Sequence, residues 1–393
     1  MVTFETRTME QVVERLIDYR GKTPTKSDTG IRLVTAKIIK DGFIQDDMAE
    51  YISEETYDAW MRRGYPEQND IVITTEAPLG EVAQIRTTER VALAQRVILL
   101  RGKPDVIDQQ YLFQALKSPR VQAGLQQRAT GTTVLGIRQS ELRQVEIPYY
   151  PLPTQHKIAA ILSAYDDLIE NNLRRIKILE EMAQNLYREW FVRYRFPGHE
   201  QARFVDSPLG RIPEAWRAKK LGEVLELNYG KALRKDNRRA GEVPVFGSSG
   251  VVGYHDSALV RGPGIVVGRK GNVGSVFWSE GDFYPIDTVY FVTSEIPLRF
   301  LFFDLQTKNF LNNDAAVPGL NRNQAYSLGI LIPAADTLGR FCRFVDDAER
   351  QLTALRHQNN ILRRTRDLLL PRLISGELDV SDLDITVPEE ACI

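Results

Sequence analysis

The chain has 393 residues, which is too long for one ordinary domain and suggests two to four structural units. Hydrophobic residues make up 43% and charged residues 26%, and no apolar run approaches the about 18–20 residues that cross a bilayer, so we expect a globular protein and not a membrane protein. The N-terminal residues include acids and lack an apolar signal core, which favours a cytoplasmic location.

The net charge of −1 argues against a protein that binds nucleic acid through charge alone. Residues 376–393 hold six acids and no base, which leaves 51 bases against 46 acids in the rest of the chain. If the chain binds DNA tightly, its bases must be clustered or a partner must supply part of the positive field.

The first α/β segment, residues 8–148, lies in a predicted domain that spans residues 1–152. A helix-like stretch at 109–125 is followed by a closing apolar run at 145–148. Short runs of β-branched and apolar residues predict strands at 71–74, 82–85 and 97–100.

A long helix is predicted next, from about Thr154, a suitable N-cap, to Val192. Its apolar positions step alternately by four and three residues, which is the heptad seam of a coiled coil. At ~1.5 Å per residue this helix would be about 57 Å long. Prolines and Gly198 then predict a linker, so residues 153–197 are assigned to a first spacer helix.

The second α/β segment, residues 216–333, lies in a predicted domain that spans residues 198–335. A second helix with the same kind of seam is predicted at 336–373, within a spacer region of residues 336–376, and residues 377–393 form an acidic tail. Strand and turn signals occur at 243–247, 264–268 and 289–292, and the segment ends in an apolar run at 328–333.

The two halves repeat one order of elements, although their sequence identity is low. In this alignment residues 74–80 correspond to 268–274, 135–139 to 320–324, 145–148 to 330–333, and 166–167 to 346–347. Two seams of similar length are most simply buried by packing on each other as an antiparallel pair. We therefore predict a mixed α+β (α/β) fold: two globular domains joined by two long antiparallel coiled-coil helices, with a rough two-fold symmetry.

Asn172 and Asn359 either fix the register of the helix pair or face solvent. The residues predicted to pack between the helices are Tyr165, Ile169, Asn172, Ile176, Leu179, Leu186, Leu352, Leu355, Asn359 and Leu362. Four further residues of the first helix either face a partner protein or pack within a domain: Leu168, Leu173, Tyr187 and Phe191.

Motifs of known catalytic sites are missing from the sequence. There is no GxxxxGK[ST] phosphate loop, no GxGxxG after a strand, no [ND]PP[YF] motif of amino-methyltransferases, no HExxH and no serine elbow. Cys342 and Cys392 form no CxxC pair or zinc pattern, and Cys342 is expected to be a small core residue. We predict a non-catalytic protein that binds no metal or cofactor directly.

Two sets of polar segments that contain glycines occur at corresponding places in the two halves, and the chemistry of their side chains suits DNA binding. Arg and Lys contact guanine or phosphate, Asn and Gln pair with adenine, and Glu accepts from cytosine. Each loop alone is also compatible with a generic surface turn, but recurrence in both halves favours a function. The predicted DNA-binding residues are Thr74, Glu76, Gln95, Arg96, Thr130, Thr132, Thr133 and Arg138 in the first half, and Ser248, Ser249, Arg269, Lys270, Asn272, Asn321, Arg322 and Asn323 in the second.

Over nearly its whole length the chain resembles the specificity subunits of type I restriction–modification enzymes. The resemblance lies in the helix ending at 369–378, the domain-to-helix junction at 145–159, the runs at 243–254 and 267–274, and the segment 284–289. The start of the second helix, 334–338, departs from the Pro-Leu-Pro-x-Gln form that the first helix has.

The resemblance implies two target-recognition domains that each read one half of a bipartite double-stranded DNA site. It implies a helix pair that sets the half-site spacing and docks two methyltransferase subunits, with restriction subunits that translocate DNA and cut it joining this core. S-adenosylmethionine, ATP and magnesium would then belong to the partners.

Two other classes of function stay open. One is a coiled-coil scaffold or adaptor of another phage-defence complex, whose terminal domains bind proteins. The other is a self-contained nuclease or methyltransferase, against which the missing cofactor and metal motifs argue.

Overall fold

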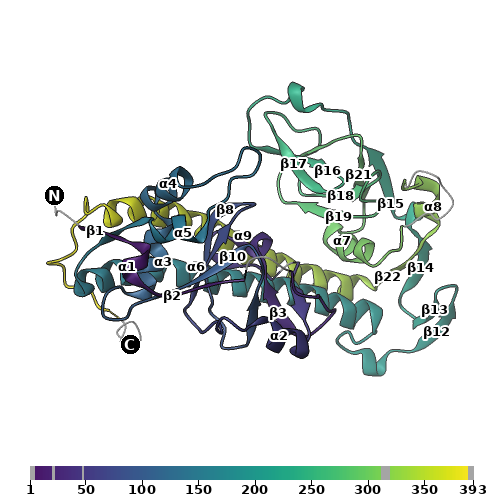
Figure 1. Ribbon diagram of the computed structural model, residues 1–393. Coiled ribbons are helices and arrows are strands. Elements are labelled where there is room, and N and C mark those ends of the chain that lie inside the picture. Colours follow the sequence, from purple (N-terminus) through teal and green to yellow (C-terminus); the bar gives the residue numbers. More distant parts are fainter. Residues whose placement is uncertain (1–4, 20–22, 47, 311–318, 388–393) are drawn as a thin grey trace. The chain divides into compact units, whose positions relative to one another are not determined.

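The computed structural model describes residues 5–19, 23–46, 48–310 and 319–387 (Figure 1). The chain forms two compact units, and each is described by itself. The first unit contains Met1–Asn172 and His357–Ile393, and the second contains Leu173–Arg356. No helix among the described residues has the length and apolarity to cross a membrane.

The first unit is built on a four-stranded antiparallel sheet in the order β2-β10-β7-β8. A three-stranded sheet, β6-β3-β9, lies beside it, and β1 pairs with β11. The strands are β1 (Glu5–Thr8), β2 (Val13–Asp18), β3 (Ile31–Val34), β4 (Ile39–Lys40), β5 (Phe43–Ile44), β6 (Glu50–Ile52), β7 (Ile71–Thr75), β8 (Leu79–Gln84), β9 (Val91–Leu93), β10 (Val97–Gly102) and β11 (Glu146–Tyr149). The short helices are α1 (Met9–Val12), α2 (Glu54–Trp60), α3 (Gln109–Lys117), α4 (Pro119–Gln127) and α5 (Gln139–Arg143).

The second unit repeats the topology of these three sheets, whereas the β4–β5 pair of the first unit and the β12–β13 pair of the second have no counterpart among the described residues. Its four-stranded sheet has the order β15-β21-β18-β19, its three-stranded sheet the order β17-β16-β20, and β14 pairs with β22. In both three-stranded sheets the central strand pairs antiparallel on one side and parallel on the other. The strands are β12 (Phe204–Ser207), β13 (Gly210–Pro213), β14 (Arg217–Lys220), β15 (Leu225–Tyr229), β16 (Val243–Gly247), β17 (Gly250–His255), β18 (Gly264–Gly268), β19 (Val276–Ser279), β20 (Tyr284–Pro285), β21 (Val289–Ser294) and β22 (Gly329–Ile332), with helices α7 (Leu298–Gln306) and α8 (Arg322–Ser327).

Strand register places Thr74 and Gly268 at the same point of the repeat. Thr74 pairs with the first residue of β10, Val97, and Gly268 pairs with the first residue of β21, Val289. The predicted correspondence of 74–80 with 268–274 therefore agrees with the strand pairing.

The predicted correspondences at the ends of the two domains are wrong by two residues. The Ile137 amide donates to the Thr75 carbonyl, and the Leu320 amide donates to the Arg269 carbonyl, so Leu320 corresponds to Ile137 and not to Leu135. Both Ile137 and Leu320 are buried, whereas Leu135 is 47% exposed. The similarity of two leucines misled the alignment, because burial and not residue type marks the repeated position.

The same error of two residues occurs at the closing strands. Thr8 pairs with Glu146 and Lys220 pairs with Gly329, so these two pairs occupy equivalent positions. Asp166 and Asp346, which the alignment matched, also lie in different environments: the Asp166 side chain is 2% exposed and that of Asp346 is 51% exposed.

The single helix predicted at 109–125 is two helices, α3 and α4. Ser118 ends α3 and caps α4, since its hydroxyl accepts from the Val121 amide, and Pro119 occupies the first turn of α4. Proline lacks the amide that would continue α3, while its fixed φ suits a helix start.

The two long helices are α6 (Leu152–Tyr187) and α9 (Ala335–Ile374), and a single π-helical turn (Arg188–Val192) follows α6. Within each unit their segments run antiparallel: Asn172 bonds Asn359 in the first unit, and Glu180 pairs with Arg356 in the second. This is the expected mixed fold of two β-rich domains with a pair of long helices.

The residues predicted to pack between the helices differ in burial. Asn172 and Asn359 are buried and bonded to each other at 2.9 Å, so the solvent-facing alternative is wrong for both. Ile169, Leu352 and Leu355 are also buried, while Tyr165, Ile176, Leu179, Leu186 and Leu362 are partly buried.

Two of the four residues considered for a partner surface are in fact core residues. Tyr187 and Phe191 are buried in the second unit, where both rings contact Phe341. Leu168 and Leu173 are 49% and 37% exposed. Cys342, as expected, packs partly buried against the second unit's core, and Cys392 lies outside the described residues.

A buried charge cluster ties α3, α6 and α9 together in the first unit. The Asp166 carboxylate accepts from Arg366 at 2.6 Å and from Gln114 at 2.7 Å, and Lys117 lies 3.2 Å away. Burial alone would raise the pKa of Asp166, but Lys117 and Arg366 outweigh it and hold the pKa below its ordinary value. The cluster fixes the globular part of the unit to its helix segments.

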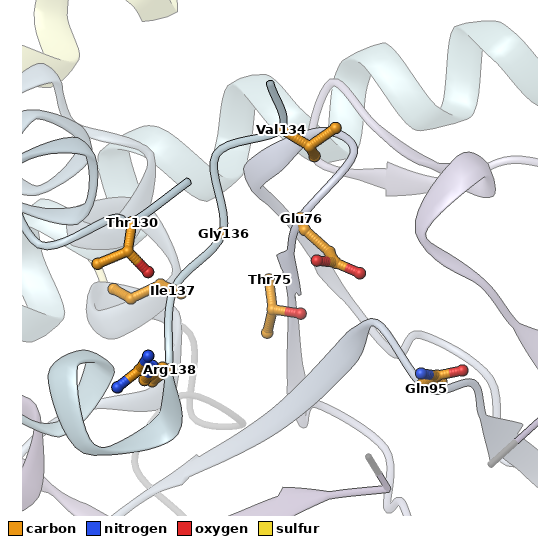
Figure 2. A pocket seen from close by; sticks show the side chains of 8 residues that line it. All are labelled: Thr75, Glu76, Gln95, Thr130, Val134, Gly136, Ile137 and Arg138. Atoms are coloured by element: carbon orange, nitrogen blue, oxygen red, sulfur yellow. The ribbon is translucent and has the colours of Figure 1, made fainter. Parts of the chain in front are cut away.

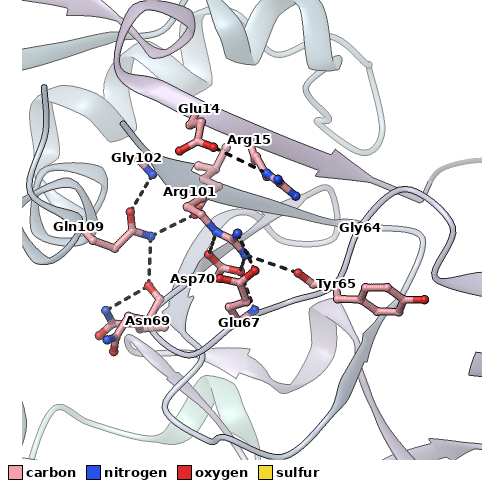
Figure 3. A network of polar contacts seen from close by, with 12 residues as sticks. Glu14, Arg15, Gly64, Tyr65, Glu67, Asn69, Asp70, Arg101, Gly102 and Gln109 are labelled. Carbon is pink, nitrogen blue, oxygen red and sulfur yellow. Dashed lines mark hydrogen bonds and ion pairs between the residues drawn. The ribbon is translucent and has the colours of Figure 1, made fainter. Parts of the chain in front are cut away.

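A second polar network holds the loop before β7 against the central strand β10 (Figure 3). Arg101 on β10 binds both carboxylate oxygens of Asp70 at 2.7 Å and also pairs with Glu67 at 2.8 Å. Gln109 accepts from the Gly102 amide at 2.7 Å and donates to the Asn69 carbonyl at 3.0 Å. The bidentate pair with Asp70 raises the pKa of Arg101 further above its ordinary value.

Candidate DNA interface

Four of the eight predicted DNA-binding residues of the first half, Glu76, Gln95, Thr130 and Arg138, line one open cavity of about 230 Å³. Figure 2 shows Thr75 and Glu76, at the end of β7, between Gln95 on one side and the segment that carries Thr130 and Arg138 on the other. The lining residues are Thr75, Glu76, Gln95, Thr130, Val134, Gly136, Ile137 and Arg138.

Backbone hydrogen bonds join three segments that are far apart in the sequence into this surface. The Thr75 amide donates to the Arg96 carbonyl at 3.0 Å, and the Ile137 amide donates to the Thr75 carbonyl at 3.0 Å. Thr130 and Gly136 exchange two further bonds, which close the loop between them. The loop needs glycine at Gly131, because its φ is +123° and a Cβ there would lie 2.1 Å from the Val134 carbonyl oxygen.

Charged side chains of both signs, Glu76 and Arg138, line this cavity, and Arg96 borders it through its contact with Glu76. Arg96 and Glu76 form an ion pair at 2.8 Å, and their side chains are 54% and 41% exposed. Gln95 accepts from the Thr23 hydroxyl at 3.2 Å. A surface with a guanidinium, a carboxylate and an amide side by side can donate to and accept from base edges.

Thr74 is the exception among the predicted residues of the first half. It is fully buried, and its hydroxyl accepts from the Glu81 amide at 2.9 Å. This side chain shapes the turn between β7 and β8 and cannot reach a DNA molecule, so its assignment to DNA contact is corrected. Thr130, Thr132, Thr133 and Arg138 are exposed.

The second unit builds the equivalent surface with the same backbone bonds. The Arg269 amide donates to the Thr288 carbonyl at 2.9 Å, and the Arg269 carbonyl accepts from the Leu320 amide at 2.8 Å. Lys270 forms a β-bridge with Gly319, as Glu76 does with Gly136. Arg269 and Lys270 therefore occupy the positions of Thr75 and Glu76.

The other predicted residues of the second half lie on neighbouring turns. Asn321 caps α8, since its side chain accepts from the Asn323 amide at 2.9 Å, and Arg322 is the first residue of that helix. The Ser248 carbonyl accepts from the Ser275 hydroxyl at 2.7 Å, which holds the β16–β17 turn against the β18–β19 turn. Ser249, Lys270, Asn272, Asn321 and Asn323 are exposed, whereas Ser248 is partly buried.

Sequence reasoning missed one residue at this surface, Tyr229. It ends β15, is 55% exposed, and packs its ring against that of Tyr290, with the ring centroids 5.0 Å apart and the ring planes tilted by 59°. Burial raises the pKa of Tyr290 to about 12, and its hydroxyl donates to the Leu320 carbonyl at 3.3 Å. An exposed tyrosine at a strand end, next to Gly230, was the available signal.

The long helices expose apolar side chains away from their seam. In the first unit these are Leu168, Ile361 and Leu368, which are 49%, 53% and 63% exposed. In the second unit Leu173, Ile178 and Met182 are 37%, 54% and 47% exposed. Among the described residues, no group of three or more His, Cys, Asp or Glu side chains is placed to hold a metal ion.

Comparison with known proteins gives a consistent result. The family profile described as "Type I restriction modification DNA specificity domain" matches residues 1–181 and 213–363. The type I restriction enzyme MjaIX specificity subunit of Methanocaldococcus jannaschii is 26% identical over 365 residues, which cover 84% of this chain and 82% of the relative. The MjaVIII specificity subunit of the same organism is 29% identical over 167 residues, 42% of this chain and 38% of the relative.

A solved structure has the same fold. The crystal structure of the type I restriction–modification S subunit from M. genitalium superposes with a TM-score of 0.58 at 17% sequence identity. The match covers 95% of this chain and 96% of that one.

Proposed function

The chain belongs to the type I restriction–modification DNA specificity family, and from this premise we propose that its two domains each read one half of a bipartite DNA target. As a specificity subunit it is not itself an enzyme, and it takes no cofactor of its own. The reading surfaces are the Glu76–Arg96 surface of the first domain and the Arg269–Arg322 surface of the second. We assign residues 1–152 and 198–335 to the two domains.

The observation that carries this proposal is the repeated reading surface. One chain contains the same sheet order twice, and in both copies the central hairpin turn is bonded to a loop just before a short helix. Two surfaces of equal construction and different side chains suit two short sequences of different content. Arg, Lys, Asn, Gln and Glu side chains on them match the donors and acceptors of base edges.

The long helices supply the rest of the proposed role. Regions 153–197 and 336–376 set the distance between the two half-sites, and their exposed apolar residues dock two methyltransferase subunits. Restriction subunits that translocate and cut DNA join this core. S-adenosylmethionine belongs to the methyltransferase subunits, and ATP with magnesium to the restriction subunits. The complex acts in the cytoplasm.

Mapping methylated bases tests the proposal. Genomic DNA is sequenced for methylation from cells that express the chain together with its methyltransferase subunits, and from cells that express those subunits alone. We expect one motif of two short sequences separated by a fixed number of unspecified base pairs, present only with the chain. A continuous motif, or methylation that does not depend on the chain, would contradict the proposal.

Footprinting of the purified complex separates this function from the scaffold alternative. A reader of two half-sites protects two patches of one duplex, with an unprotected or weakly protected spacer. A scaffold that binds only proteins protects neither patch.

A further inference from the structure

Two arginines of the second unit converge on one exposed tyrosine ring. The guanidinium carbon of Arg269 lies 5.3 Å from the Tyr229 ring centroid, and that of Arg322 lies 5.4 Å from the same centroid. Arg269 is also 5.8 Å from the Tyr290 ring, and Arg322 is 5.9 Å from the Tyr326 ring. Stacking on aromatic faces restrains both guanidinium groups before any ligand arrives.

Arg269 is held in a way that leaves one edge of its guanidinium without a partner among the described residues. Its Nε and Nη2 atoms both donate to the Asp287 carbonyl, at 3.2 and 2.7 Å. Three N–H groups remain, and one on Nη1 together with one on Nη2 forms the end edge that fits two neighbouring acceptors. Among the described residues Arg322 makes a single long hydrogen bond, 3.5 Å from its Nη1 to the Leu227 carbonyl, and its other donors have no acceptor there.

Neither arginine forms an ion pair within the described part of the chain. Other arginines do: Arg96 on the first reading surface pairs with Glu76 at 2.8 Å, and Arg299 on α7 lies within 4 Å of three carboxylates. Two like charges around one ring repel each other, and among the residues that the structure describes no carboxylate pairs with either guanidinium to offset this repulsion. Such an arrangement is suited to an external acceptor.

The position of the pair places it on the reading surface. Arg269 corresponds to Thr75 by the shared backbone bonds, and Arg322 corresponds to Gln139, since each is the first residue of the helix after the buried Ile137 or Leu320. The first domain therefore has neutral side chains where the second has two cations. The two surfaces are built alike but differ in chemistry.

We propose that Arg269 and Arg322 read at least one guanine in the half-site of the second domain, which rests on the proposed function. The major-groove edge of guanine presents N7 and O6 as adjacent acceptors, and an arginine end edge binds both at once. Phosphate oxygens also accept from arginine, but such contacts are the same at every sequence and require no fixed edge. Because the guanidinium of Arg269 is restrained, we expect it to contact a guanine base and not a phosphate.

The test leaves the protein unchanged and alters the DNA. The complex of the chain with its methyltransferase subunits is titrated with duplexes that carry its mapped target, in which one guanine at a time is replaced by 7-deazaguanine. This base pairs normally but lacks the N7 acceptor. We expect one or two positions, all in one half-site, at which affinity falls about 10-fold.

Variants then connect those positions to the two arginines. Arg269→Gln and Arg322→Gln each remove a guanidinium and with it the pair of N–H donors that would bind guanine. Arg261→Gln is the matched control, because Arg261 is an exposed arginine of the same unit with no partner among the described residues. In Arg269→Gln or Arg322→Gln, 7-deazaguanine should no longer lower affinity at the guanine that the replaced arginine reads. Base changes in the other half-site should keep their full effect on affinity. With Arg261→Gln the penalty should persist.

Three results would overturn the inference. The first is a bipartite target in which no guanine is sensitive, which leaves the proposed function intact. The second is a penalty that survives in both reading variants. The third is equal weakening on all duplexes, which identifies phosphate contact. A wild-type complex without a bipartite target would instead remove the proposed function itself.

Discussion

Individual residues of the first reading surface divide into those that build the turn and those that face solvent. Thr74 and Glu76 are two residues apart on the same strand end, yet Thr74 is buried and hydrogen-bonded to a backbone amide while the Glu76 side chain is 41% exposed. Substitutions at the two positions should therefore affect different properties.

Thr74→Val should lower stability without changing the DNA target. The methyl group fills the space of the hydroxyl, but the Glu81 amide loses its acceptor, which costs about 1 kcal/mol. Urea unfolding of the wild-type and variant chains measures the loss, and methylation mapping measures the target. A variant of unchanged stability would show that the Glu81 amide finds another acceptor.

Glu76→Gln should change the DNA target with little effect on stability. The ion pair with Arg96 is exposed, so its loss changes the free energy of unfolding by less than about 1 kcal/mol. The amide both donates and accepts, so the preferred bases of the half-site read by the first domain should change, while the other half-site stays the same. The methylation map records both halves at once, and a change in the second half only would contradict the assignment.

The sequence could predict these single residues only in part. Polar residues that cluster beside glycine at repeated positions predict Glu76, Arg96, Arg269 and Arg322 as DNA-binding residues, and that assignment stays a prediction. The contact of Arg269 with Tyr229 could not be predicted, because forty residues separate them and only the pairing of β15, β21 and β18 brings them together.

Among the elements, the join between globular sheet and long helix depends on the buried carboxylate of Asp166. Asp166→Asn should destabilise the chain by about 3–5 kcal/mol, because Lys117 would remain buried without its counter-charge and Arg366 would keep only its pair with the exposed Asp367. Asp167→Asn is the matched control: its side chain is 67% exposed, and its pair with Arg86 contributes less than about 1 kcal/mol. Denaturant unfolding of both variants distinguishes them, and equal losses would contradict the role of the cluster.

Because Asp166 stabilises the fold in its charged form, we expect the stability of the chain to depend on pH in acid. The folded-state pKa of Asp166 lies below its ordinary value of 3.8, because Lys117 and Arg366 outweigh the effect of burial. Its stabilisation is therefore complete above pH 3.8 and is lost as the pH falls through the lowered folded-state value. In acid the wild-type chain should lose stability more steeply than Asp166→Asn. If the free energy of unfolding falls equally with decreasing pH in the wild-type chain and in Asp166→Asn, Asp166 is not the cause of the loss of stability in acid.

Elements were predicted well where a pattern was long and poorly where it was short. The two long helices followed from heptads sustained over more than thirty residues. The break between α3 and α4 was missed, although Ser118 and Pro119 form an N-cap followed by proline, because the apolar spacing continues across it. The register between the halves slipped by two residues, since Leu135 resembles Leu320 in type while Ile137 matches it in burial.

For the whole molecule, the repeated topology explains how one chain can address two different sequences. Each unit has its own core, so side chains on one surface can change without disturbing the other. The order of elements could be predicted from the sequence because both copies keep their strand and turn signals. The difference in charge between the two reading surfaces could not, because it depends on which arginines lack an ion pair.

The most direct measurement is the methylation map of a chain lengthened in both long helices. One heptad is inserted into α6 and one into α9, which keeps the apolar seam in phase and adds ~10.5 Å, or about three base pairs of B-DNA. We expect the same two half-sequences as in the wild-type map, separated by about three more base pairs. An unchanged spacing, or a change in either half-sequence, would contradict the account of two independent readers held apart by a helix pair.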